Sequence, residues 1–306
     1  MSYQDPSKPP FRADHVGSLL RPTHLHKARK LHLSEDISDI DLREIEDECI
    51  TQAIARQEEV GLLSVTDGEY RRESWHYDFL CGLEGIEATG SSQGPAFKGG
   101  HKVKSLQVSS KISNPSGIML DHFKFLNLKT NVTPKFCIPS PSLAYHRGGQ
   151  QFIDKSVYPD VEEFWDDLCA AYRKEVTLLA DAGCTYLQLD DTTFAMLCDP
   201  NVRDQMSQRG DLPDQLISIY SRGIEQALSE RPSNITVTVH MCRGNFKSSW
   251  IAEGGYEPVA EKMFAEVPVD GFFMEWDTDR AGGFEPLRYA PRDKMIVLGL
   301  VSSKLP

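Results

Sequence analysis

The sequence lacks a long apolar run, a disulfide framework and any excess of positive charge. Its 306 residues are 40% hydrophobic and 25% charged, and no apolar run approaches the ~18 residues of a membrane-spanning helix. The formal net charge is -12, from 33 basic and 45 acidic residues, which disfavours general attraction to nucleic-acid phosphates. This composition argues against a membrane protein and against a nucleic-acid-binding protein.

The cysteines also exclude one class of protein. The chain has seven, an odd number without regular spacing, in a chain too large to need disulfide staples. The first ten residues are polar and proline-rich and have no apolar segment of a secretory signal. We therefore expect a reducing, cytoplasmic location.

Short runs rich in Val, Ile and Leu alternate with longer helical patterns, which is typical of βα units around a parallel sheet. The predicted strands are His15–Ser18, Leu62–Asp67, Phe136–Pro139, Tyr186–Asp190, Ile235–Cys242, Gly271–Glu275 and Met295–Val301. The predicted helices are Asp41–Gly61, Val161–Ala182, Leu212–Glu230 and Tyr256–Ala265. Gly61 and Gly183 stand where a glycine commonly ends a helix.

The stretch from Gly90 to Pro134 has the least regular pattern. Gly90–Gly100 is predicted to be a loop, and Val103–Ser110 to be a strand or an outlying hairpin. No linker and no internal repeat divides the chain. We expect a single α/β domain over residues 1–306, and α/β barrels commonly have this length.

Polar side chains follow the predicted strands at their carboxyl ends, where barrel enzymes collect their functional groups. His240 and Cys242 lie two residues apart and therefore share one face of a strand. Imidazole, thiolate and carboxylate all suit zinc, and Glu275 could join them from the next strand. A lone His-x-Cys pair is more often part of a core, so the surrounding strand ends matter to this hypothesis.

Those strand ends carry Phe11-Arg12-Ala13-Asp14-His15-Val16-Gly17-Ser18, Asp67-Gly68-Glu69, Leu187-Gln188-Leu189-Asp190, His240-Met241-Cys242 and Glu275. In order and spacing they resemble the carboxyl-terminal catalytic domain of cobalamin-independent methionine synthase, especially its single-domain relatives. The resemblance covers nearly the whole chain. It implies a (β/α)8 TIM barrel, complete or nearly complete and, if incomplete, at its carboxyl-terminal end. It also implies zinc-dependent transfer of a methyl group to a thiol, from 5-methyltetrahydropteroyltriglutamate to homocysteine.

The resemblance also implies roles for individual residues. His240, Cys242 and Glu275 match zinc ligands, while Glu69 and Asp190 match the carboxylates that hold the homocysteine amino group. The segment Val16, Gly17 and Ser18 matches the backbone turn that meets the homocysteine carboxylate. No catalytic residue beyond these is predicted. Alternatively, Glu69 and Asp190 cap helices or pair with Arg71 or Arg72.

The chain departs from the family pattern at its carboxyl-terminal end. A further Cys ligand in a late strand has no counterpart, since no Cys follows Cys242. Cys81, Cys137 or Cys198 could replace that ligand, although each is more simply interpreted as a small buried apolar residue. We expect a weaker zinc site and, if the sheet stays open, self-association.

A second departure concerns the methyl donor. The family's histidine near Leu298–Ser302 aligns with Val301, and its pterin-stacking tryptophan has no match near Ser140–Ser142. The donor therefore stays open between a folate, a methylated corrinoid protein and another methylated thiol or amine. The loop Arg71–Tyr77 either shapes a donor pocket or is a solvated helix start.

Two other functions remain open on the sequence alone. One is a metal-free enzyme resembling uroporphyrinogen decarboxylase, against which His240 and Cys242 argue. The other is a shortened barrel with a binding role and no turnover, for which the absent Cys argues.

Overall fold

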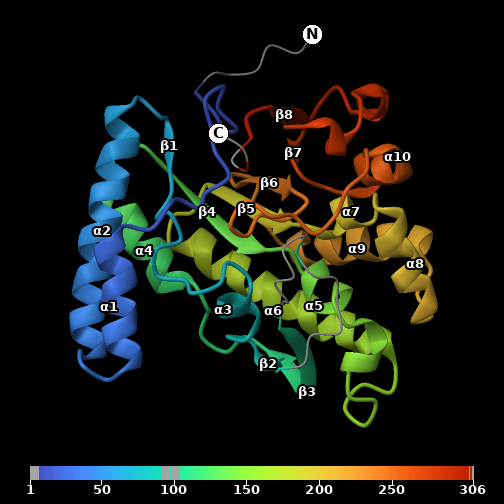
Figure 1. Cartoon of the computed structure of the whole chain (residues 1–306), viewed down its shortest axis with the longest axis horizontal. Coiled ribbons are helices and arrows are strands. Elements are labelled where there is room, and N and C mark those ends of the chain that lie inside the picture. Colours follow the sequence, from blue (N-terminus) through green and yellow to red (C-terminus); the bar gives the residue numbers. More distant parts are fainter. Residues whose placement is uncertain (1–6, 91–96, 98–103, 303, 305–306) are drawn as a thin grey trace.

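The chain folds around one curled parallel sheet. The structure, a computed structural model, describes residues 7–90, 97, 104–302 and 304. Six strands in the order β1-β4-β5-β6-β7-β8 form a half-barrel in the described part of the chain (Figure 1). Their bounds are Ser64–Val65 (β1), Thr133–Pro139 (β4), Tyr186–Asp191 (β5), Thr236–Met241 (β6), Gly271–Glu275 (β7) and Met295–Gly299 (β8).

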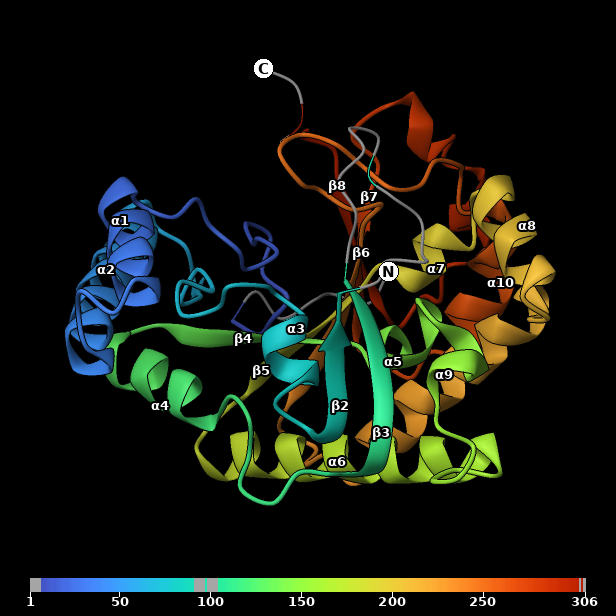
Figure 2. The same ribbon diagram turned by 60° about the horizontal axis from the view of Figure 1, so that its bottom comes forward.

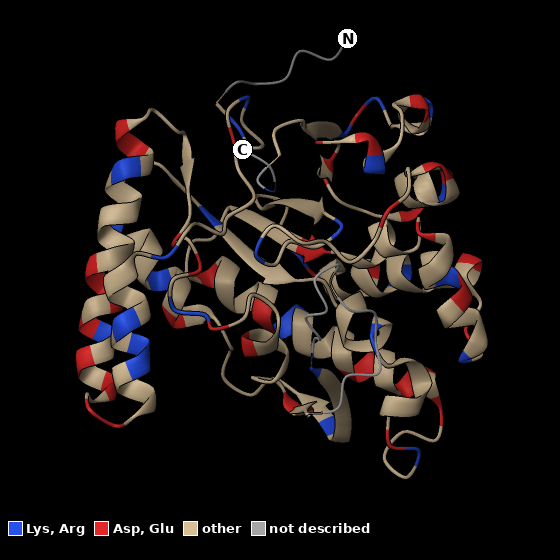
Figure 3. Cartoon of the chain, viewed as in Figure 1, with Lys and Arg blue, Asp and Glu red and all other residues tan. Residues whose placement is uncertain are grey.

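Helices cover the sheet and both of its ends. The longer ones are Thr23–Leu33 (α1), Asp39–Glu59 (α2), Leu120–Lys129 (α4), Val161–Asp181 (α6), Pro200–Gln208 (α8), Pro213–Leu228 (α9) and Glu257–Glu266 (α10). Three short helices are Tyr77–Leu80 (α3), Ser142–His146 (α5) and Thr193–Met196 (α7). Helices α1 and α2 lie at one end of the sheet, and α8 and α10 at the other (Figure 2). Lys, Arg, Asp and Glu gather on the outer helices, while the strands are largely free of them (Figure 3).

The predicted architecture of a parallel α/β sheet is confirmed, and among the described residues β1 and β8 do not pair with each other. The prediction for Gly271–Glu275 matches β7 residue for residue, and the predicted Val161–Ala182 differs from α6 by one residue. Gly61 and Gly183 follow α2 and α6 with φ of 84° and 97°. Helices α1, α4 and α8, and the short helices α3, α5 and α7, are additional to the sequence prediction.

The strand predicted for His15–Ser18 is wrong. Its carbonyl groups accept hydrogen bonds from side chains rather than from a neighbouring strand. Lys135 donates to the His15 carbonyl, Gln188 to the Val16 carbonyl at 2.9 Å, and Thr66 to the Gly17 carbonyl at 2.6 Å. This segment is therefore a loop laid across the inner face of the sheet.

An antiparallel hairpin stands outside the sheet. It consists of Glu84–Thr89 (β2) and Ser105–Ser113 (β3), which pair with each other and pack beside α6 (Figure 2). The hairpin interpretation of Val103–Ser110 is thereby confirmed for Ser105–Ser110, and residue 103 lies outside the described residues. Most of the predicted loop Gly90–Gly100 also lies outside the described residues. None of the helices in the described segments is long and apolar enough to cross a membrane.

A buried ion pair fastens the amino-terminal loop to the sheet. Lys135 Nζ lies 3.1 Å from Asp14 Oδ1, and both side chains are 0% exposed. Tyr186 Oη donates to the other Asp14 oxygen at 2.7 Å. The Lys135 ammonium also lies 4.1 Å from the centre of the Phe273 ring. A buried pair with these extra bonds resists separation, because removing one partner leaves an uncompensated charge.

We predict that Lys135→Met lowers the free energy of unfolding by about 3–5 kcal/mol, because Asp14 is left buried and unpaired. Urea denaturation measures the change. Lys111→Met is the control, since Lys111 pairs with Glu163 at 3.0 Å where both side chains are half exposed, and such a pair contributes below about 1 kcal/mol. An equally small loss in both variants would contradict the role given to Lys135.

Candidate functional site

The candidate site lies at the carboxyl ends of the strands. Residues two apart on a strand face the same side, so His240 and Cys242 both face the inside of the half-barrel. Asp190 on β5 is the register partner of His240 on β6. Glu275 ends β7, and Glu69 follows β1. The fold thus brings residues more than 200 positions apart to one edge of the sheet.

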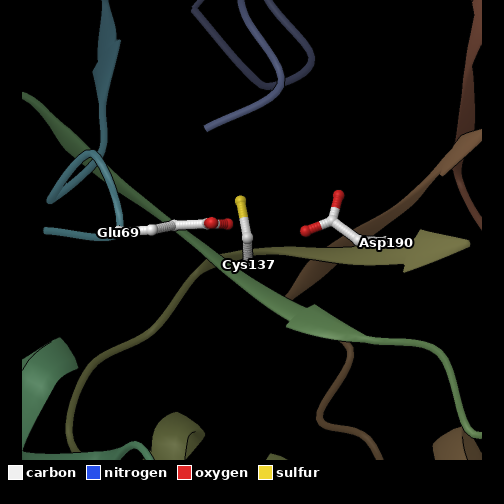
Figure 4. A group of neighbouring side chains, drawn as sticks. All are labelled: Glu69, Cys137 and Asp190. Atoms are coloured by element: carbon white, nitrogen blue, oxygen red, sulfur yellow. The ribbon is translucent and has the colours of Figure 1, made fainter. Parts of the chain in front are cut away.

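Glu69 sits on a tight turn after β1. Gly68 and Glu69 both have positive φ, 63° and 59°, and the Glu69 N–H donates to Asp67 Oδ1 at 2.9 Å. A positive φ is unfavourable for a glutamate and is found mainly where surrounding contacts enforce it. Figure 4 shows the result, a Glu69 carboxylate that points toward Asp190.

The Glu69 carboxylate is buried and only partly neutralised. Arg72 Nη1 lies 3.6 Å from Oε1, so the pairing that the sequence left open for Arg72 is present. The other oxygen, Oε2, is buried without a hydrogen-bond partner. Burial raises the pKa of Glu69 to about 7; Arg72 opposes this rise, while Asp190 and Asp67 add to it. The carboxylate therefore favours a further positive group.

Asp190 connects two parts of the site. Its Oδ1 accepts from Gln188 Nε2 at 2.7 Å and lies 2.9 Å from His240 Nδ1. A carboxylate bound to one ring nitrogen fixes the imidazole and leaves the other nitrogen for a ligand, as at many zinc sites. Asp190 thus touches a predicted metal ligand as well as facing Glu69.

Cys137 lies between the two carboxylates. Sulfur and carboxylate oxygens of Glu69, Cys137 and Asp190 all lie within 4.8 Å of one another (Figure 4). The three residues are 2%, 3% and 6% exposed. Burial raises the pKa of Cys137, and the charge on Asp190 adds to that rise.

His240 and Cys242 form a second cluster next to Asp190. The imidazole hydrogen-bonds the Cys242 side chain as well as Asp190. Burial lowers the pKa of His240, but the charge on Cys242 and the bonds to Asp190 and Cys242 outweigh it and raise the pKa to about 10. His240 and Cys242 are therefore together, as the strand pattern predicted.

Glu275 is occupied by other partners. Its Oε2 accepts from the Arg243 backbone N–H at 2.7 Å, and its Oε1 contacts Arg280 and, at 3.1 Å, Lys304. Among the described residues, ligand atoms within 4.8 Å of one another form one group of three, Glu69, Cys137 and Asp190. The structure thus does not gather Glu275 with His240 and Cys242, and a zinc site of these three stays a prediction.

The predicted carboxylate-binding turn lies on the same edge. Gly17 is buried, whereas Val16 and Ser18 are exposed. Gly17 has φ of 108°, and a Cβ at this position would lie 2.5 Å from Cys137 Sγ. Only glycine permits this close approach of the backbone to Cys137.

The loop after Glu69 is buried rather than solvated at its two arginines. Arg71 pairs with Glu46 at 3.3 Å and also contacts Asp47. Arg72 donates to the Cys137 carbonyl at 2.5 Å. The segment then begins the short helix α3. Both arginines are therefore engaged in contacts within the protein. Their contacts do not support the hypothesis that Arg71–Tyr77 shapes a donor pocket.

Sequence reasoning missed several residues that shape this site. Gln188, Arg280 and Lys304 contact Asp190 or Glu275, and Cys137 was considered only as a replacement ligand or a core residue. Gln188 could have been found, because it shares a strand face with Asp190. Cys198 is buried and donates to the Phe194 carbonyl at 3.4 Å, which agrees with a core residue. Cys81 is partly exposed.

Known proteins resemble the chain over most of its length. No family model matches it. The uncharacterized protein YxjH of Bacillus subtilis is 43% identical over 300 residues, which cover 97% of this chain and 79% of YxjH. A solved structure from Listeria monocytogenes, assigned as a vitamin B12-independent methionine synthase, is 37% identical with a TM-score of 0.79, and the match covers 97% of this chain and 81% of that one. A methionine synthase of Sulfurisphaera tokodaii is 27% identical over 243 residues, 76% of this chain and 61% of that protein.

We predict that the environment of Glu69 makes stability depend on pH. Its folded-state pKa of about 7 lies above the ordinary value of 4.5, so the folded protein keeps a proton that the unfolded chain releases. The free energy of unfolding should therefore fall as pH rises between these two values, by up to about 3 kcal/mol. In Glu69→Gln this contribution disappears.

Urea denaturation of both proteins across this pH range measures the difference. Glu163→Gln is a matched control, because Glu163 is half exposed. A Glu69→Gln protein whose stability follows the same pH curve as the parent would show that Glu69 does not titrate there.

Proposed function

Since this chain belongs to the cobalamin-independent methionine synthase family and is a methyltransferase, we propose that it transfers a methyl group to the thiol of homocysteine at a zinc site. The first support is Asp190, which hydrogen-bonds His240 on one side and faces Glu69 on the other. One side chain thereby links the residues proposed for the thiol to those proposed for the amino group.

His240 and Cys242 fit a zinc ion. The Nδ1 atom of His240 is taken by Asp190, so Nε2 is available as a ligand, and Cys242 supplies a sulfur on the same strand face. Zinc bound there would lower the pKa of a coordinated substrate thiol and so supply a thiolate. Glu275 fits only if it leaves Arg280 or Lys304, which both hold its Oε1.

Glu69 and Asp190 suit an ammonium group. Both carboxylates are buried, and Glu69 Oε2 has no partner, so an α-ammonium would satisfy an oxygen that is otherwise desolvated. Arg72 neutralises Glu69 only in part, from 3.6 Å. The exposed backbone at Val16 and Ser18 would receive the carboxylate of the same amino acid. These residues orient the acceptor beside His240 and Cys242.

The methyl donor is proposed as 5-methyltetrahydropteroyltriglutamate, with a related methylated compound as the alternative. The segment where the family carries its stacking tryptophan holds Ser140 and Ser142, whose hydroxyls lie 2.9 Å apart. Ser142 donates to Asp191 at 2.5 Å. These serines are committed to a buried network, which favours testing other donors as well.

The two rival functions lack comparable support. A metal-free decarboxylase would not need the His240–Asp190 pair beside Cys242. A methyl-transfer assay distinguishes the proposed activity from a binding role without turnover. We place the protein in the cytoplasm, since its seven cysteines are free thiols.

We predict that protein supplied with zinc converts homocysteine to methionine with the folate donor, measured by mass spectrometry. Glu69→Gln should raise the KM for homocysteine at least about tenfold, because a charge-assisted hydrogen bond to the ammonium contributes ~1.5–3 kcal/mol. Glu163→Gln is the exposed control. If another methylated compound supports turnover and the folate does not, that compound is the donor instead of the folate. If no donor supports turnover, the proposal is contradicted.

We predict that Cys242→Ser lowers zinc affinity by more than about 100-fold, and Asp190→Asn by about 10–100-fold through His240, since even indirect partners have effects of this size. Lys304→Met should raise the affinity severalfold by freeing Glu275. Competition with a chromogenic chelator measures all three, and no activity is needed.

Lys294→Met is the control for Lys304→Met, because Lys294 donates to the Val267 carbonyl at 2.6 Å, away from Glu275. If Lys304→Met and Lys294→Met bind zinc alike, Glu275 is not held off the metal by Lys304. If Cys242→Ser binds zinc as the parent does, the proposed ligand set is wrong.

A further inference from the structure

The group of Glu69, Cys137 and Asp190 has the composition of a metal site. A thiolate and two carboxylates are ligands that zinc and similar borderline ions accept together. Their atoms lie within 4.8 Å of one another, a separation that small side-chain movements reduce to that of ligands around one ion. The group shares no member with His240, Cys242 and Glu275.

This group contains a buried carboxylate oxygen without a hydrogen-bond partner. Glu69 Oε2 is buried and has no hydrogen-bond partner, and Glu69 itself is 2% exposed. The known bonds of Asp190, to Gln188 and His240, both go to Oδ1. Figure 4 shows the Glu69 carboxylate and one Asp190 oxygen directed toward the Cys137 sulfur from opposite sides.

The sulfur is held weakly by its present partners. Cys137 Sγ lies 3.7 Å from the Val16 carbonyl and 3.6 Å from Gln188 Nε2. Both are weak contacts for a thiol. A cation would compensate the charge of the two buried carboxylates. Arg72 pairs with Glu69 alone of the two, at 3.6 Å.

We propose that Glu69, Cys137 and Asp190 form a second divalent-cation site, which takes Zn2+ or a similar thiophilic ion in competition with the substrate ammonium. Binding forms one metal–sulfur and two metal–oxygen bonds. The Cys137 proton passes to solvent, as does the Glu69 proton in molecules where that carboxyl group is protonated. No electron is transferred. A water molecule completes the four ligands usual for zinc.

Competition follows because the same two carboxylates would serve the ion and the ammonium. This part rests on the proposed function, whereas binding of the ion does not. An excess of zinc would therefore inhibit the enzyme by filling the amino-group pocket, while zinc at His240 and Cys242 supports it. Because Cys137 must lose a proton, occupancy should increase with pH.

Cd2+ is a suitable probe, since a cadmium–thiolate bond gives an ultraviolet charge-transfer absorption. The experiment uses Cys242→Ser protein, which removes the sulfur of the other cluster. We expect one equivalent of Cd2+ to bind with this absorption, and Zn2+ to displace it. Cys137→Ser in the same background should abolish the absorption.

Cys198→Ser in that background is the matched control, because Cys198 and Cys137 are both 3% exposed. It should bind Cd2+ as the Cys242→Ser protein does. Circular dichroism and urea denaturation identify any variant that fails to fold. Binding that persists without Cys137, or its absence from folded Cys242→Ser protein, would overturn the site.

Methionine tests the competition, since it carries the ammonium without a thiol that chelates the probe. At ten times its own dissociation constant it should raise the apparent Kd for Cd2+ about tenfold, as expected for mutually exclusive binding. Cd2+ binding that methionine does not affect would overturn the competition and the ammonium position, and leave the metal site. Methionine binding without Cd2+ binding would overturn the metal site and leave the proposed function.

Discussion

The ion pair between Lys135 and Asp14 is the contact on which the candidate site depends. It joins β4 to a loop that has no backbone ladder of its own, at a depth where neither side chain reaches solvent. The Lys135 ammonium also donates a hydrogen bond to the His15 carbonyl, so the same group fixes the position of the backbone that leads into Val16 and Gly17. A loop fixed in this way can present backbone groups to a small molecule without the support of a closed sheet.

Charge in the site is arranged around Asp190. This carboxylate orients the imidazole of His240, accepts a hydrogen bond from Gln188 and raises the pKa of the nearby Glu69. Arg72, Arg280 and Lys304 each balance one glutamate without reaching Asp190. The result is a buried group of carboxylates beside a His–Cys pair, an environment that suits the cationic amino group of the proposed acceptor.

The sequence was informative wherever periodicity and strand-end position decide the outcome. The bounds of β7 follow from a short apolar run, and the common face of His240 and Cys242 follows from the alternation of side chains along a strand. Helices α2 and α6 end two residues before the expected glycines. The loop His15–Ser18 was misassigned because its partners are side chains of residues far along the chain. Likewise, the ion pairs of Glu275 with Arg280 and Lys304, and the place of Cys137 between two carboxylates, depend on tertiary packing that local patterns do not encode.

The contact between Gly17 and Cys137 restricts how this site can change during evolution. A Cβ at residue 17 would lie 2.5 Å from the Cys137 sulfur, so the two positions share one small volume. A larger side chain at either position would require a smaller one at the other, and Gly17 has no side chain that could be reduced. Substitution at residue 137 is thus restricted to small side chains, whereas the exposed side chain of Val16, next to Gly17, tolerates substitution.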